Sequence, residues 1–175
     1  MNFITANILT IVTFLPMAGA VLLLFYRSEH IRSIRAFALV VTILTFVVSL
    51  HLIAHFDSSN QDFQFAVKIP WMPSYGIDYA VGIDGISLFL ILLTTLLSPL
   101  AVLASWSIHE RLKEYFIFML LLETGMIGVF ASLDLFLFYV FWEIMLIPMY
   151  FLIGVWGGER QIYAALKFVL YTMVG

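Results

Sequence analysis

One carboxylate lies in the middle of a long apolar run. Residues 133–157 read LDLFLFYVFWEIMLIPMYFLIGVWG, and Glu143 is the one charged residue between Leu135 and Gly157. A charge at the centre of a membrane-spanning helix costs about 2.5–3.5 kcal/mol, so it needs a partner, water or a proton. Because burial favours the neutral acid and a nearby cation favours the charged form, Glu143 is suited to proton transfer within a membrane. The alternative is a structural glutamate that is hydrogen-bonded to an adjacent helix and never titrates.

A proline follows closely after Glu143. Pro148 removes a backbone donor and disturbs the carbonyl of Ile144, so we expect a helix kink within one turn of the carboxylate. Backbone groups freed at that depth must be satisfied by neighbouring helices or by water. The kink and the charge therefore point to the same place.

A second carboxylate, Glu123, lies near the midpoint of the preceding apolar segment, and Gly125 and Gly128 follow it. Small residues at this spacing allow another helix to approach closely. Two roles stay open for Glu123. It extends a polar path from Glu143, or it is a hydrogen-bonding group inside a helix bundle.

Three other side chains are weaker candidates. Lys167 is a further candidate for proton transfer, but it lies near enough to a membrane boundary for its charge to reach water. His51 and His55 share one helix face, yet two ligands are too few for a zinc site. We interpret the two histidines as interfacial residues and expect no metal site.

The composition indicates the class of protein. The chain is 63% hydrophobic and 11% charged, against roughly 45–50% and 25% in soluble domains. Long apolar runs exclude a transmembrane barrel and predict an all-α polytopic membrane protein embedded in a lipid bilayer. A net charge of −3 does not favour a nucleic-acid partner. Without cysteine, the chain offers no thiolate for an iron–sulfur cluster, so we expect no cofactor in this chain.

Hydropathy predicts one membrane domain over residues 1–175. The expected elements are five spans at about 4–26, 36–56, 86–106, 115–131 and 133–157, an extramembrane loop at 57–82, and the start of a sixth helix at 162–175. The last segment, about 14 residues, is shorter than the roughly 20 that span a bilayer. We therefore expect this chain to be the amino-terminal portion of a longer protein.

Two aspartates mark predicted helix starts. Asp84 and Asp134 each precede an apolar segment and are well placed as N-caps. The connection between the fourth and fifth spans is so short that these spans must be antiparallel. This hairpin brings Glu123 and Glu143 to comparable depth, although the sequence does not decide whether they face each other.

The distribution of basic residues predicts the orientation. Connections after the first, third and fifth spans carry six basic residues, whereas the opposite side carries Lys68 alone. The six are Arg27, Arg32, Arg35, Arg111, Lys113 and Arg160. Because basic loops stay in the cytoplasm, the N-terminus is expected on the outer, periplasmic side of a bacterial inner membrane.

Several of these stretches together resemble a known family. They are DLFLFYVFWEIMLIPMY from Asp134, WGG from Trp156, AALKF from Ala164, PWMP from Pro70 and GIDGISL from Gly82. In this combination the chain resembles the antiporter-like proton-channel subunit M (chain 4) of respiratory complex I. The resemblance covers most of the chain beyond residue 65, and the first two spans match only in pattern.

The resemblance implies a bundle of about fourteen transmembrane helices built from inverted five-helix repeats with broken helices. It also implies that Glu143 pairs with a lysine on a seventh helix, and that changes in this pair couple quinone reduction to proton movement. NADH, FMN, iron–sulfur clusters and quinone would then bind elsewhere in the complex, and other membrane-arm subunits would be partners. Glu123 is outside the family motif and receives no role from it.

Two other functions stay open. A subunit of a multisubunit sodium/proton antiporter shares the Trp-Glu and Pro pattern around Glu143, although the 70–88 block favours complex I. A non-pumping structural membrane piece, whose helices only contact others, is the alternative of a different class.

Overall fold

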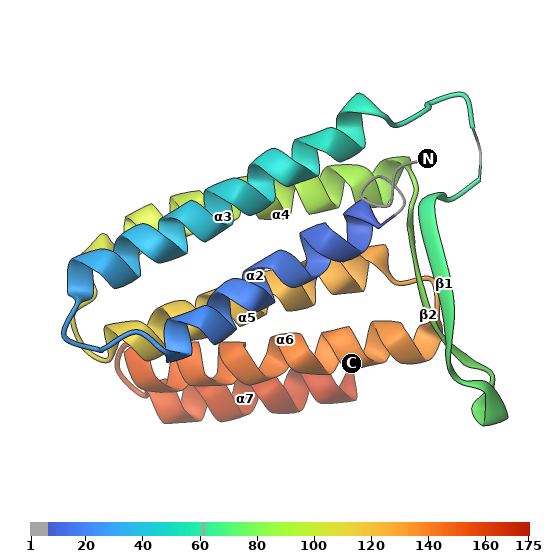
Figure 1. The fold of residues 1–175 in the computed structure, drawn as a ribbon. Coiled ribbons are helices and arrows are strands. Elements are labelled where there is room, and N and C mark those ends of the chain that lie inside the picture. Colours follow the sequence, from blue (N-terminus) through green and yellow to red (C-terminus); the bar gives the residue numbers. More distant parts are fainter. Residues whose placement is uncertain (1–6, 61) are drawn as a thin grey trace.

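The computed structural model describes residues 7–60 and 62–175. In chain order the elements are α2 (Ile8–Leu24), α3 (Ile31–Ala54), β1 (Gln64–Met72), η1 (Pro73–Tyr75), β2 (Ile77–Ile83), α4 (Gly85–Ala104), η2 (Ser105–Ser107), α5 (Leu112–Ala131), α6 (Leu135–Trp156) and α7 (Gln161–Val174). Figure 1 shows the helices lying side by side along one direction, with the two strands across one end of the bundle. The predicted start of the first span, residue 4, lies outside the described residues.

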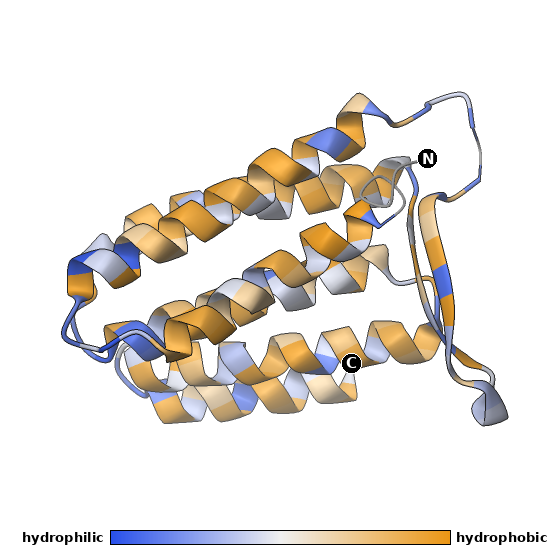
Figure 2. Cartoon of the chain, viewed as in Figure 1, coloured by the Kyte–Doolittle hydropathy of each residue, from blue (hydrophilic) through white to orange (hydrophobic). Residues whose placement is uncertain are grey.

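The helical membrane fold is confirmed. Within the described residues, four helical segments are long and apolar enough to cross a membrane. They are Ile31–Ala54, Gly85–Ser107, Leu112–Ala131 and Leu135–Trp156, while α2 and α7 are shorter apolar helices. Figure 2 shows hydrophobic residues along the length of every helix and hydrophilic residues concentrated at the bundle ends.

Helix α3 begins earlier than its hydropathy indicates. It starts at Ile31 rather than near residue 36, so Arg32 and Arg35 are helical. Arginine is a good helix former, and its apolar stem can be buried while its head finds acceptors. Arg35 does this: it is buried, and its Nη2 donates to the carbonyl of Ile108 at 2.7 Å.

The region predicted as a loop contains an antiparallel β-hairpin. Strands β1 and β2 pair with Val67 opposite Val81 and Ile69 opposite Tyr79. Pro70 obscures the strand pattern, but a two-stranded sheet has only edge strands, where proline is tolerated. Gly76 has a φ of 67°, a left-handed conformation that favours glycine, and it ends η1 at the hairpin tip.

The hairpin is attached to the end of the bundle. The backbone amide of Leu133 donates to the carbonyl of Ala80 at 2.8 Å, and the Tyr79 hydroxyl donates to Thr10 Oγ1 at 3.1 Å. These contacts connect β2 to helix α2 and to the short α5–α6 connection. The hairpin therefore covers the end of the bundle at which α6 begins.

The buried core has a polar layer between two apolar clusters. One cluster includes Ile91 and Ile127, and the other includes Val102 and Leu120. Between these positions lie buried polar residues on α2, α3, α4 and α5: Thr13, Thr42, Thr45, Ser49, Thr94, Thr95, Ser98, Glu123 and Thr124. A helix bundle that has a polar layer at mid-length has a place where ionisable chemistry can occur.

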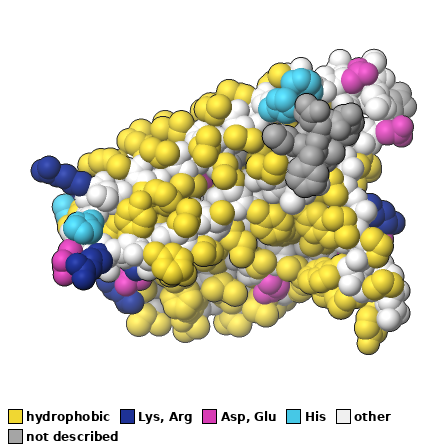
Figure 3. Space-filling model, in the orientation of Figure 1, with side chains coloured by type: hydrophobic (Ala, Val, Ile, Leu, Met, Phe, Trp, Pro, Cys, Tyr) yellow, Lys and Arg dark blue, Asp and Glu magenta, His cyan; other side chains and the backbone are white. Residues whose placement is uncertain are grey.

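The two ends of the bundle differ in charge. Most of the Lys and Arg side chains visible in Figure 3 gather at the end opposite the hairpin, and apolar side chains cover the surface between the ends. Lys113 donates to the carbonyls of Leu24 at 2.7 Å and Tyr26 at 2.9 Å, at the end of α2. A cation at a helix C-terminus satisfies free carbonyls and stabilises the helix dipole.

Candidate functional site

Helices α5 and α6 approach closely at Gly125 and Gly128, the two glycines at which the sequence predicts close packing. A Cβ atom added at Gly125 would lie 3.0 Å from Cα of Met145, and one added at Gly128 would overlap the ring of Phe141. This register places Glu143 level with residues 126–127 of α5. The two carboxylates are therefore about one helical turn, or roughly 5 Å, apart in depth. The prediction of comparable depth is confirmed.

Two N-caps fix the helices that carry or face these carboxylates. Asp84 accepts from the Ser87 amide at 2.8 Å, and the Asp84 amide donates to Ser87 Oγ at 3.0 Å, which forms a capping box for α4. Asp134 accepts from the amides of Phe136 and Leu137 at the start of α6. Both predicted caps are confirmed.

Glu143 lies half-buried on the face of α6 that is turned towards α7. It lines an open cavity of about 330 Å³, together with Leu146, Ile147, Tyr150, Phe151, Val169 and Met173. Among the described residues no hydrogen bond or ion pair is formed by its carboxylate. Apart from the Tyr150 hydroxyl the wall is apolar, so this part of the chain provides almost nothing to stabilise the charge.

Pro148 is buried inside α6, which runs without interruption from Leu135 to Trp156. Its missing N–H leaves the carbonyl of Ile144 without the usual intrahelical donor one turn away. The bend expected at this position stays a prediction.

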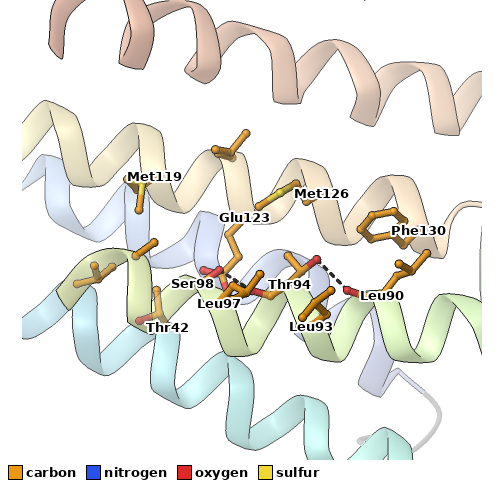
Figure 4. Close-up of a pocket in the computed structure, with 13 residues that line it drawn as sticks. Thr42, Leu90, Leu93, Thr94, Leu97, Ser98, Met119, Glu123, Met126 and Phe130 are labelled. Carbon is orange, nitrogen blue, oxygen red and sulfur yellow. Dashed lines mark hydrogen bonds between the residues drawn. The ribbon is translucent and has the colours of Figure 1, made fainter. Parts of the chain in front are cut away.

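Glu123 faces a different side of the bundle. It is 1% exposed and points from α5 towards Thr94 and Ser98 of α4 (Figure 4). The cavity that it lines measures about 220 Å³ and also contacts Thr42 of α3. Neither Glu123 oxygen has a hydrogen-bond partner among the described residues. The two glutamates therefore line separate cavities and do not face each other.

Lys167 is not brought to Glu143. It is exposed on α7, with its Nζ 5.9 Å from the ring centre of Tyr163 and 5.6 Å from that of Tyr171. Cation–π contacts with two aromatic rings stabilise a surface lysine in place. Val169 and Met173, not Lys167, are the α7 residues that reach the Glu143 cavity.

The two histidines stack on each other. Their ring centres lie 4.0 Å apart, and Nδ1 of His55 is 3.1 Å from the carbonyl of His51. No group of three or more potential metal-ligating side chains occurs within residues 7–60 and 62–175. His51 lies in the last turn of α3 and His55 is its C-cap, and their interfacial position stays a prediction.

Sequence reasoning missed the hydroxyl groups that face Glu123. Thr94 and Ser98 are one turn apart on α4, a spacing that places both on one helix face. The pattern was visible, but serine and threonine are common in membrane helices and carry no charge. Only the rotation of α4 against α5 shows that they lie opposite a carboxylate.

Comparison with known families gives two matches that together cover nearly the whole chain. Residues 8–129 match the family described as NADH-ubiquinone oxidoreductase chain 4, amino terminus. Residues 132–175 match the family described as NADH:quinone oxidoreductase/Mrp antiporter, TM. The boundary between the matches falls at the α5–α6 connection.

Curated relatives are similar over the same range. NADH-quinone oxidoreductase subunit M of Rhodobacter capsulatus is 48% identical over 173 residues, which cover 97% of this chain and 33% of the relative. NADH-ubiquinone oxidoreductase chain 4 of Arabidopsis thaliana is 48% identical over 162 residues, covering 91% and 33%. The chain thus spans about a third of the length of these relatives.

Solved structures share the fold. A chain of respiratory complex I from Thermus thermophilus with bound NADH superposes with a TM-score of 0.79 at 30% identity, covering 95% of this chain and 33% of that one. A chain of an archaeal membrane-bound sulfane sulfur reductase superposes with a TM-score of 0.73 at 22% identity, covering 94% and 25%. The second likeness concerns the fold alone.

Proposed function

The chain belongs to the family of NADH-ubiquinone oxidoreductase chain 4, and from that premise we propose that it forms part of a proton-translocating subunit in the membrane arm of NADH:quinone oxidoreductase. In this proposal Glu143 is the carboxylate that takes up and releases protons. Electron transfer from NADH through FMN and iron–sulfur clusters to quinone takes place in other subunits, and this chain catalyses no redox step by itself.

The observation that carries the proposal is the setting of Glu143. A carboxylate halfway along a membrane-length helix, open to a cavity and without a partner in the described residues, is costly to keep for structure alone. Intramembrane carboxylates of this kind typically belong to proton pathways. The apolar wall formed by Ile147 and Val169 leaves protonation, water or a cation from another segment as the ways to neutralise it.

The physical mechanism is a change in the surroundings of one carboxylate. When the lysine that the family resemblance places on a seventh helix is close, the ion pair favours the charged form of Glu143. When that lysine moves away, the apolar cavity favours the neutral acid, and Glu143 takes up a proton. Moving a cation therefore moves a proton, and no redox group is needed in this chain.

The proposed setting is an integral membrane complex in a bacterial inner membrane. In this orientation the end of the bundle at which Lys113 contacts the end of α2 faces the cytoplasm, and the β-hairpin end faces the periplasm. Other membrane-arm subunits and the lipid bilayer cover the apolar flanks. This orientation rests on the uneven distribution of basic residues.

The second candidate is a subunit of a multisubunit sodium/proton antiporter. It is favoured by one specific observation, because the family matched by residues 132–175 is described by both names. The two candidates differ in what drives proton movement. A complex I subunit translocates protons only when NADH is oxidised, whereas an antiporter exchanges sodium for protons in vesicles without NADH.

The test uses the full-length chain in its assembled complex, reconstituted in sealed vesicles. Glu143→Gln keeps the shape of the side chain and removes its titration. We expect proton uptake per NADH oxidised to fall about tenfold or more, a loss within the range of a positioned proton-transfer group. Glu159→Gln, at an exposed carboxylate between α6 and α7, is the matched control and keeps the proton yield. An unchanged yield in Glu143→Gln, with assembly intact, contradicts the proposal.

A further inference from the structure

Glu123 is a fully buried carboxylate on α5 that faces the hydroxyl groups of α4. In the described residues neither carboxylate oxygen has a hydrogen-bond partner, although the side chain is 1% exposed. A buried charge without a partner is strongly unfavourable, so an unpaired carboxylate at this depth requires a compensating ligand. This site lies outside the α6–α7 cavity used in the proposed function.

The nearby hydroxyl groups are already committed as donors. Thr94 Oγ1 donates to the carbonyl of Leu90 at 2.8 Å, and Ser98 Oγ donates to the carbonyl of Thr94 at 2.9 Å (Figure 4). On α3, Thr42 Oγ1 donates to the carbonyl of Leu39 at 3.0 Å. A hydroxyl has one hydrogen, so each of these oxygens presents only lone pairs to the cavity.

Among the described residues, Glu123 is the one charged residue that lines this cavity. Helix α4 contributes hydroxyl and apolar groups, and α3 contributes Thr42. The buried cation of α3, Arg35, lies about two turns from Thr42 and is directed to Ile108 and His109 instead. From α6, Glu143 lines the other cavity.

An ionised carboxylate only accepts hydrogen bonds, whereas a protonated carboxyl group carries one donor. The hydroxyls of Thr42, Thr94 and Ser98 donate to backbone carbonyls, so their oxygens can accept the hydrogen of the acid form. We propose that Glu123 is a second proton-binding site of this chain, which holds its proton in a cavity separate from that of Glu143. The step is the reversible addition of one proton to a carboxylate oxygen, and no other bond is made or broken.

The cavity suits a proton better than a metal cation. Calcium and magnesium take six to eight oxygen ligands, but this wall supplies one carboxylate and three hydroxyls among side chains such as Leu97, Met119 and Met126. About 220 Å³ is enough for several water molecules of about 30 Å³ each, which can carry a proton to Glu123. Leu93 and Leu97 on the rim are half exposed, so the cavity opens on the apolar flank of the bundle.

The test is covalent labelling by N,N′-dicyclohexylcarbodiimide, an apolar reagent that adds to protonated carboxyl groups. The full-length protein in its assembled complex is labelled in vesicles, cleaved after methionine with cyanogen bromide, and analysed by mass spectrometry. Met119, Met126 and Met145 define two useful fragments. Fragment 120–126 has Glu123 as its single acid, and fragment 127–145 contains Glu143.

We expect fragment 120–126 to gain one reagent adduct at neutral pH and to lose it as the pH rises. The adduct disappears in Glu123→Gln and is kept in Glu143→Gln and in Glu159→Gln, which shows that it does not depend on the proposed pump site. No adduct at neutral pH or below overturns the proposal. Equally, suppression of labelling by sodium chloride relative to choline chloride overturns it, because a cation site would then be present.

Discussion

Glu143 and Glu123 lie about one turn apart in depth, on two helices that touch at Gly125 and Gly128, yet their surroundings differ. Glu143 is half-buried against α7 in an almost entirely apolar cavity. Glu123 is itself fully buried, and it lines a cavity to which α3 and α4 contribute hydroxyl groups. Two carboxylates at nearly the same depth therefore meet different surroundings, because they lie on helix faces that turn towards different neighbours.

The difference predicts a contrast in chemistry. Apart from Tyr150, the residues that line the Glu143 cavity are apolar, so its wall offers few hydrogen-bonding groups to the carboxylate. The wall of the Glu123 cavity offers fixed acceptors that favour the acid form locally. In the proposed functions, the state of Glu143 is set by a cation on another segment, and the state of Glu123 is set by α3 and α4.

The largest effect is expected from a cation introduced beside Glu143 and not beside Glu123. Val169→Lys places a cation in the Glu143 cavity, which this residue lines. We expect a permanent ion pair with Glu143 and a loss of proton translocation of about tenfold or more. An ion pair that stabilises the charged form by about 1.4 kcal/mol already lowers the population of the protonated form tenfold. NADH-driven proton uptake in vesicles measures it. Labelling of fragment 120–126 stays unchanged, because Glu123 lies on the other side of α5. An unaltered proton yield contradicts the account.

A second change breaks the contact that separates the two sites. Gly128→Leu forces a side chain into the ring of Phe141 and pushes α6 away from α5. We expect a destabilisation of about 1–3 kcal/mol, typical of overpacking, measured as a lower thermal midpoint of the purified full-length complex. Gly158→Ala is the matched control, because nothing lies within 4 Å of a Cβ added there. Equal stability of the two variants would show that the close approach is unimportant.

A smaller effect is expected at the N-cap of α4. This helix lines the Glu123 cavity but not the Glu143 cavity. Asp84→Ala removes the capping box and should cost about 0.5–2 kcal/mol of stability, measured by thermal unfolding. Hydrogen bonds from Ser87 hold the pKa of Asp84 below its ordinary value. The cap therefore stabilises the folded protein above the pKa of the unfolded chain, and its contribution falls as the pH drops through the lowered folded pKa. A variant that loses the same stability at every pH excludes this role for the carboxylate.

The smallest effect concerns the hairpin, which contacts the α6 side through Trp71 and Phe136. Lys68 and Asp78 form an exposed ion pair at 2.9 Å, and this pair raises the pKa of Lys68. Its contribution is present below the unfolded pKa of lysine and is lost as the pH rises through the raised folded value. Because surface pairs are screened by solvent, Lys68→Ala should leave the thermal midpoint within error. A clear fall would mean that the hairpin depends on this charge.

Much of the helical frame could be predicted from the sequence. Apolar run lengths gave the helices, Asp84 and Asp134 gave two of their starts, and the short connection after Ala131 gave the depth relation between the glutamates. These features are local, since each depends on a few neighbouring residues. Local patterns are what a single sequence states most clearly.

The rest depends on contacts between distant segments. Hydropathy does not predict the rotation of α5 that turns Glu123 towards Ser98. Because a membrane helix is apolar on all sides, its hydropathy does not show which face packs against a neighbour. Pro70 and Pro73 interrupt the strand pattern, so the sequence did not predict the hairpin. The buried position of Arg35 depends on the carbonyl of Ile108, more than seventy positions later. Such facts require the packed bundle.

The role proposed for Glu143 is tested by the rate of carbodiimide labelling at this residue with and without NADH, in the same vesicles. Fragment 127–145 reports Glu143, and its adduct is assigned by its absence in Glu143→Gln. If the proposal is correct, Glu143 is labelled faster during NADH oxidation than at rest, because turnover draws the cation away and populates the acid form. Equal labelling rates at Glu143 in both conditions would contradict its role as the proton-carrying group.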